Sequence, residues 1–210
     1  MQLALKKGIL FVLSGPSGAG KNTLLNAVLE KVPEVHYSVS ATTRPSRPGE
    51  INGRNYFFIS PERFQQGIEA GEFLEWTEFC GHYYGTPRRF IDERLAEGKS
   101  VIMDVDIRGA AQIKSQLPEV VSVFLLPPNM AVLHQRLVGR ASEEEEAIRR
   151  RLEKALCEVQ ALTDYDYVIV NEDLDLAVER MKAIIIAERQ RVTRIDCQRI
   201  MDQVLGGMLE

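Results

Sequence analysis

The chain has 210 residues, of which 45% are hydrophobic and 27% charged, a composition typical of globular proteins and a length sufficient for one α/β domain with a smaller attached piece. Its net charge of −4 argues against a surface that binds polyanions, so no nucleic-acid partner is expected. No apolar run approaches the roughly 20 residues that cross a bilayer, so no membrane partner is expected. The three cysteines are widely separated, which favours a cytoplasmic protein.

A phosphate-binding loop follows the first predicted strand. The apolar run at residues 9–14 leads into GPSGAGKNT, residues 15–23, and a helical pattern follows. The spacing G-x-x-x-x-G-K lets backbone N–H groups surround phosphate oxygens while the lysine reaches the β- and γ-phosphates. The dinucleotide pattern G-x-G-x-x-G does not fit, because its last position is Thr23. The predicted ATP-binding residues of this loop are Gly15, Pro16, Ser17, Gly18, Ala19, Gly20, Lys21, Asn22 and Thr23.

Asn22 occupies the position where this motif usually has a hydroxyl that binds Mg²⁺. Two alternatives are open. The Asn22 carboxamide oxygen could bind the metal directly, or the ion could keep most of its waters, bridge the ATP oxygens and meet Thr23 or Asp104 through water. We favour the second alternative, because the substrate phosphates can hold most of the metal.

Residues 35–97 interrupt the alternation of strands and helices. The segments HYSVSATT, RNYFFIS and EFLEWTEF alternate polar and apolar residues between turn signals, which predicts a small, mostly antiparallel sheet. A loop in this insert carries Arg44 and Arg47, with Tyr56 shortly after, and a later segment carries Glu75 and Tyr84. Taken singly, these could equally be surface charges and aromatic residues of the insert's core.

Three further apolar runs, at residues 101–105, 121–126 and 167–170, predict buried strands, each followed by a helical pattern. Such alternation is typical of a parallel sheet covered by helices on both faces. Asp104 lies at the end of the first of these strands, with Asp106 two residues later, which places two carboxylates at the end of a buried strand.

The later helices have recognisable beginnings. Asn129 is placed to cap a helix over residues 130–138, and Ser142 with Glu145 forms a capping box for the next helix. A further helix is predicted over residues 174–190.

The expected fold is therefore α/β: a phosphate-loop parallel sheet with helices on both faces, a small β insert and a helical lid. The core is assigned to residues 8–34 and 98–188, the insert to residues 35–97, and the arginine-rich lid to residues 136–151. Residues 189–210 are expected to form a helical tail.

Six motifs in order along the chain, GPSGAGK, TTRPSRPGE, NYFF, YYGT, DVDIRGA and YDYVIVN, resemble those of guanylate kinases from about Gly8 to Glu188. The resemblance implies a core, a GMP-binding insert and a lid that close over ATP and GMP, with Mg²⁺ as cofactor. The implied reaction is phosphorylation of GMP, and also of dGMP, by ATP, a step of purine nucleotide metabolism.

The resemblance also assigns residues by position. The GMP phosphate is expected to contact Arg44, Arg47, Tyr56 and Tyr84, and guanine to contact Ser40, Glu75, Thr86 and Asp106. The ATP phosphates are expected to meet Arg136, Arg140 and Arg151 on lid closure, with Asn171 near the adenine. Catalysis is assigned to Lys21, Arg44 and these three lid arginines.

These residue types suit their assigned roles. Arginine makes bidentate, permanently charged contacts to phosphate. A carboxylate such as Glu75 can accept from the N1–H and N2–H₂ groups of guanine together, whereas adenine would leave those acceptors unpaired. The attacking phosphate oxygen is already anionic, so no catalytic base is expected and the rate depends on positioning and charge neutralisation.

Two other classes of protein fit parts of the sequence. Non-catalytic guanylate-kinase-like scaffold modules lack the phosphate loop, whereas Lys21 and the lid arginines are present here. A DNA-acting phosphate-loop NTPase is disfavoured by the acidic composition and the lack of a nucleic-acid motif. We therefore predict an enzyme whose ligands are ATP and GMP, without a prediction of its oligomeric state.

Overall fold

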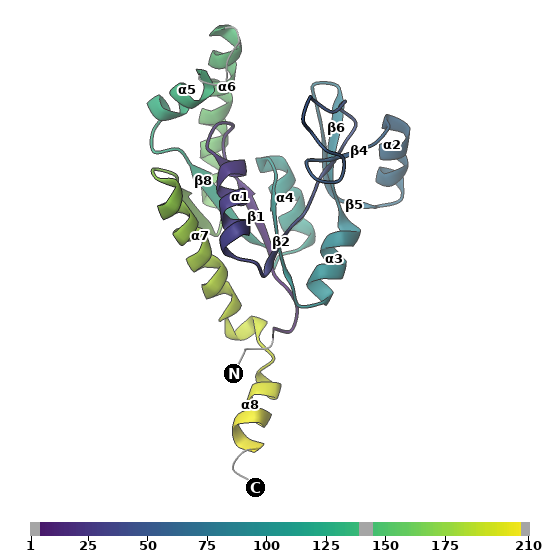
Figure 1. Cartoon of the computed structure of the whole chain (residues 1–210), viewed down its shortest axis with the longest axis vertical. Coiled ribbons are helices and arrows are strands. Elements are labelled where there is room, and N and C mark those ends of the chain that lie inside the picture. The colour runs from purple at the N-terminus through teal and green to yellow at the C-terminus, as the bar shows by residue number, and fades with distance from the viewer. Residues whose placement is uncertain (1–4, 139–144, 207–210) are drawn as a thin grey trace.

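The computed structural model describes residues 5–138 and 145–206, which form two sheets and the helices around them (Figure 1). The larger sheet has five parallel strands in the order β2-β7-β1-β8-β9. Their bounds are β1 Leu10–Ser14, β2 Val35–Tyr37, β7 Ser100–Asp104, β8 Val121–Leu126 and β9 Tyr167–Val170. The predicted parallel sheet is confirmed, and the four predicted strands lie within one residue of their expected bounds.

β1 lies in the middle of this sheet, and its side chains alternate between two cores. Phe11 and Leu13 pack with α1 (Lys21–Lys31) and α7 (Leu174–Arg189). Leu10 and Val12 pack on the other face with α3 (Arg88–Ala96) and α4 (Ile107–Gln116). Because helices cover both faces, the strand is apolar throughout, which explains the continuous run in the sequence.

The smaller sheet has the order β4-β3-β6-β5. Its strands are β3 Ala41–Thr42, β4 Phe57–Phe58, β5 Phe73–Phe79 and β6 His82–Pro87, and α2 (Pro61–Glu69) packs beside them. The pairs β3–β6 and β5–β6 are antiparallel, and β3–β4 is parallel. The hairpin of β5 and β6 turns at Cys80 and Gly81, whose φ angles of 52° and 75° suit a two-residue turn that follows the strand twist.

The two sheets are joined through β2 and α3. The sequence assigned residues 35–97 to the insert, and the structure pairs the first three of them, β2, with β7 of the larger sheet. α3 packs under the same sheet through Ile91 and Leu95. α4 also fastens the smaller sheet, since Gln116 Nε2 donates to the Leu74 carbonyl at 2.8 Å. The insert therefore leaves the larger sheet after Tyr37 and returns to it at α3.

Helices α5 (Met130–Val138) and α6 (Glu145–Val159) form a separate pair, which rises beside the upper end of the larger sheet, opposite the smaller sheet (Figure 1). Leu133, Leu137 and Ala155 make their common core. The predicted cap of α5 is confirmed, because Asn129 Oδ1 accepts from the Val132 N–H at 2.9 Å. Ser142, predicted to begin the next helix, lies outside the described residues.

Beyond α7 the chain continues through a 3₁₀ turn at Val192–Arg194 into α8 (Cys197–Gly206), which extends away from the sheet (Figure 1). A β-bridge between Leu5 and Ile195 ties this tail to the N-terminal segment. Among the residues that the structure describes, no helix has both the length and the apolar character needed to cross a membrane.

Candidate active site

The phosphate loop connects β1 to α1 at the carboxyl edge of the larger sheet. Gly15, Gly18 and Gly20 have φ angles of 145°, 91° and 99°, a region that glycine enters without steric cost. No side chain caps the N-terminus of α1, so the N–H groups of its first turn point outward as donors for an anion. The loop therefore has the backbone shape of a phosphate cradle.

Lys21 folds back over this loop, and its Nζ donates to the Gly15 carbonyl at 2.6 Å. Burial lowers the pKa of Lys21, and the nearby carboxylates Asp104, Glu158 and Asp106 oppose that effect. Lys21 is therefore a partly buried cation at the phosphate loop, with acidic neighbours that favour its charged form.

A cavity of about 320 Å³ opens in front of the loop, with walls from both sheets and from α6. It brings together many of the residues that the sequence assigned to the site, although they come from four separate segments of the chain. Those that line it are Gly15, Ser17, Lys21, Ser40, Tyr56, Glu75, Tyr84, Asp104 and Asp106.

Glu75 lies at the insert end of this cavity and is only 6% exposed. Thr86 Oγ1 donates to its Oε1 at 2.7 Å, and burial raises the pKa of Glu75 to about 7 although that hydrogen bond opposes the shift. A Cβ added at Gly109 would lie 2.9 Å from Glu75 Oε2, so the carboxylate packs directly on the backbone of α4. Asp106 caps α4, with Oδ1 accepting from the Gly109 N–H at 2.8 Å.

The residues expected to hold the GMP phosphate are two tyrosines that line the cavity and two arginines on a neighbouring loop. Tyr56 and Tyr84 line the cavity, with ring centroids 6.1 Å apart. The guanidinium of Arg44 lies 5.4 Å from the Tyr56 ring and makes two hydrogen bonds of 2.8 Å to Glu50. The Arg47 N–H also donates to Glu50, and these donors lower the pKa of Glu50 to about 2. Glu50 therefore organises the loop that carries both arginines.

The residues expected on the ATP side contact the phosphate loop itself. Arg136 donates to the carbonyls of Ala19 at 3.3 Å and Asn171 at 3.1 Å, and Asn171 Nδ2 donates to Ala19 at 2.7 Å. Arg151 donates to Ser17 Oγ at 2.6 Å.

Three residues assigned to the ATP and metal side remain to be placed. Asn22 and Thr23 are exposed in the first turn of α1, and Arg140 lies outside the described residues.

Two cavity residues on α6 were missed by the sequence analysis. Lys154 and Glu158 follow Arg151 by three and seven residues, which places all three on one face of the helix. Lys154 Nζ lies 3.5 Å from Glu158 Oε1 and 5.1 Å from the ring centroid of Phe79 in the insert. The helical spacing was a signal from which they could have been predicted.

The donor set fits magnesium as an ion carried by the substrate. In the described part of the chain, no group of three or more His, Cys, Asp or Glu side chains gathers as a metal site. Mg²⁺ usually keeps several waters and is bound through one or two carboxylates together with substrate phosphates. Asp104 at the cavity is such a carboxylate, and Thr23 in the first turn of α1 carries a hydroxyl oxygen.

Comparison with known proteins shows which family has this arrangement. The family model described as guanylate kinase matches residues 7–188. The guanylate kinase of Desulfitobacterium hafniense (strain Y51) is 49% identical over 187 residues, which cover 89% of this chain and 94% of the relative. That of Symbiobacterium thermophilum is 50% identical over 188 residues, covering 90% and 89%. The crystal structure of guanylate kinase from Anaplasma phagocytophilum matches with a TM-score of 0.79 at 32% identity, covering 96% of each chain.

Proposed function

The chain belongs to the guanylate kinase family, enzymes that phosphorylate GMP with ATP, and we propose that it does so as a cytoplasmic, Mg²⁺-dependent enzyme that also accepts dGMP. Its products are ADP with GDP or dGDP, which places it in purine nucleotide metabolism. dGMP carries the same base and the same phosphate as GMP, so the contacts proposed below apply to both.

One observation carries the proposal: Lys21, Asp104 and Glu75 line the same cavity of about 320 Å³. ATP phosphates in the loop would meet Lys21 at one end. GMP would lie across the cavity with guanine at Glu75, whose carboxylate accepts from N1–H and N2–H₂. Thr86 and Asp106 support this base site, since Thr86 holds the carboxylate and Asp106 holds the helix beneath it.

The phosphoryl transfer uses charge and position. Tyr56 and Tyr84 donate hydrogen bonds from their hydroxyl groups to the GMP phosphate, and Arg44 with Arg47 neutralises its charge from the insert. Lys21 and the lid arginines Arg136, Arg140 and Arg151 act on the ATP phosphates, where negative charge develops on transfer. The part of residues 35–97 that lies between Tyr37 and α3 thus serves as the GMP-binding insert, and residues 136–151 serve as the lid that excludes water.

A bound magnesium ion would supply neutralisation of the negative charge on the ATP phosphates. On this chain Asp104 and Thr23 would hold it through its waters. Asn22 is exposed at the start of α1. It helps to begin the helix and to line the phosphate loop, and it does not bind the ion directly.

The test is an assay of ADP release with ATP and one acceptor at a time. We expect turnover with GMP and dGMP, and only traces with AMP, CMP, UMP and dTMP. Efficient turnover of AMP would contradict the base site built on Glu75.

The Lys21→Ala variant tests the phosphate loop. It should lower kcat by about 100-fold or more, with an unchanged Tm, because Lys21 acts on phosphate charge. Lys31→Ala is the control, since that lysine lies exposed at the other end of α1 and pairs with Asp175. Near-normal turnover of Lys21→Ala would contradict the proposed role of the loop.

A further inference from the structure

Tyr37, at the end of the edge strand β2, contacts the carboxylate at the end of the neighbouring strand. Its hydroxyl donates to Asp104 Oδ1 at 2.8 Å. The register of the sheet produces this contact, since Tyr37 pairs with Ile102 and Asp104 follows on the same face two residues later. A tyrosine side chain is long enough to reach that diagonal position.

The tyrosine ring is anchored and its hydroxyl is directed at the site. The ring packs against the core between the larger sheet and α1, a core that includes Ile102. Asp104 lines the cavity with Lys21 and is the foremost acidic group acting on that lysine. A phenol anchored in the core therefore holds one oxygen of a carboxylate that lines the cavity.

We propose that Tyr37 is a positioning residue for phosphoryl transfer, which holds Asp104 in the orientation that receives the waters of the ATP-bound magnesium. The inference rests on the proposed function for the location of the metal. Tyr37 is not among the residues that line the cavity and acts through Asp104, so its loss should affect the metal and turnover, and GMP binding little.

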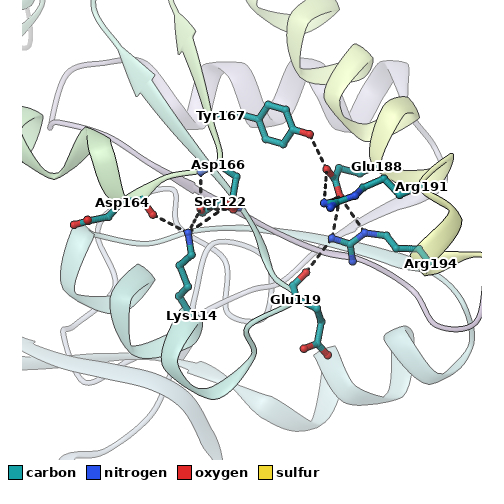
Figure 2. A network of polar contacts seen from close by, with 9 residues as sticks. All are labelled: Lys114, Glu119, Ser122, Asp164, Asp166, Tyr167, Glu188, Arg191 and Arg194. Atoms are coloured by element: carbon teal, nitrogen blue, oxygen red, sulfur yellow. Dashed lines mark hydrogen bonds and ion pairs between the residues drawn. The ribbon is translucent and has the colours of Figure 1, made fainter.

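A merely structural tyrosine is the competing explanation, and the chain contains a matched control for it. Tyr167 in β9 donates to Glu188 at 2.6 Å, so it also joins a phenol to a carboxylate (Figure 2). Glu188 is 2% exposed and is held as well by Arg191 and Arg194, among residues that line a separate cavity of about 990 Å³. Tyr37→Phe therefore removes a phenol–carboxylate hydrogen bond inside the active site, and Tyr167→Phe removes an equivalent one outside it.

The experiment measures the Mg²⁺ concentration for half-maximal turnover, and ATP affinity by calorimetry with and without Mg²⁺. Tyr37→Phe should raise the Mg²⁺ midpoint by about tenfold or more, the loss expected for one hydrogen bond to a charged group. It should also reduce the gain in ATP affinity that Mg²⁺ provides, with the GMP KM unchanged. Tyr167→Phe should lower Tm and leave the Mg²⁺ midpoint at the wild-type value.

The Asp104→Asn variant tests whether Tyr37 acts through Asp104. If Tyr37 acts through Asp104, Tyr37→Phe should add nothing to Asp104→Asn in either measurement. A wild-type Mg²⁺ midpoint in Tyr37→Phe, equal shifts in both tyrosine variants, or additive effects with Asp104→Asn would each overturn the inference. Should the wild-type enzyme fail to phosphorylate GMP, the proposed function fails, and the calorimetric comparison still decides whether Tyr37 supports metal-dependent ATP binding.

Discussion

Glu75 is buried at the position proposed to recognise guanine. Thr86 donates a hydrogen bond to its carboxylate, which packs on α4, and burial raises its pKa to about 7. Removing a carboxylate from water disfavours its charge, and guanine would supply two further donors to the charged form. In the free enzyme the environment of Glu75 therefore disfavours the charged carboxylate, and a bound guanine would favour it.

Wild type and Glu75→Gln should differ in the pH dependence of their stability. The unfolded chain releases the Glu75 proton near pH 4.5 and the folded chain near pH 7, so folded wild type binds more protons between these values. Its stability therefore falls as pH rises through this window, by on the order of 3 kcal/mol. Glu75→Gln lacks this loss and should be the more stable protein at pH 8 but not at pH 4, as urea unfolding would measure.

The same variant should lose GMP kcat/KM by a large factor, because an amide presents a donor where guanine needs an acceptor, and the ATP KM should change little. Thr86→Ala is the control for the stability measurement, since loss of its donor should move the titration of Glu75 to higher pH. A stability difference between Glu75→Gln and wild type that stays constant from pH 4 to pH 8 would contradict the assignment.

Among the elements, α4 contributes most to the shape of the base site. Asp106 caps its N-terminus, and the cap accepts from Gly109, whose backbone lies against Glu75. Further along, Gln112 and Gln116 hydrogen-bond to the backbone of β5, the strand that carries Glu75. One helix of the core thus sets the position of a carboxylate that belongs to the insert.

Gly109→Ala should impair GMP binding specifically. The new Cβ would lie 2.9 Å from Glu75 Oε2, so the carboxylate must move by several tenths of an ångström. A GMP KM about tenfold higher is expected, since a 1 Å misplacement can cost about 100-fold. The ATP KM should stay near the wild-type value.

Gly67→Ala in α2 is the matched control for this change. Its Cβ would also meet a side chain, the ring of Phe73, at 2.7 Å, but on the side of the insert that does not line the cavity. It should alter Tm without raising the GMP KM. An equal rise of the GMP KM in both variants would show that α4 has no special role.

At the scale of the whole molecule, the cavity lies where three parts of the structure meet: the larger sheet, the smaller sheet and α6. Lys154 on α6 lies 5.1 Å from the ring centroid of Phe79 on the β5–β6 hairpin, so a cation–π contact crosses the cavity from the lid helix to the insert. The two parts proposed to flank the substrates therefore touch through side chains that are both half-exposed or more.

Phe79→Leu should weaken GMP binding modestly. Exposed cation–π contacts contribute about 0.5–1 kcal/mol, so the GMP KM should rise roughly two- to fivefold. Phe57→Leu changes another exposed phenylalanine of the same sheet and should leave the KM unchanged. Steady-state kinetics at saturating ATP would measure both, and equal values for the two variants would mean that the contact does not help to close the cavity.

The sequence by itself determined the features that depend on neighbouring residues. The phosphate loop needs its glycines and Lys21 at fixed spacing on one turn of chain, and the buried strands need continuous apolar runs. Both were recognisable without a structure, as were the cap of α5 at Asn129 and the family motifs. Their physics is local, so a short window of sequence contains all the interacting groups.

The tertiary structure alone decided which side chains hold the site residues in place. Tyr37 and Asp104 are 67 residues apart, and only the parallel pairing of β2 with β7 brings them within hydrogen-bond distance. The contact of Lys154 with Phe79 likewise requires α6 and the hairpin to face each other across the cavity. Such contacts depend on strand register and on the relative placement of whole elements. No local pattern encodes these, because chain segments far apart in sequence must first pack against a common core.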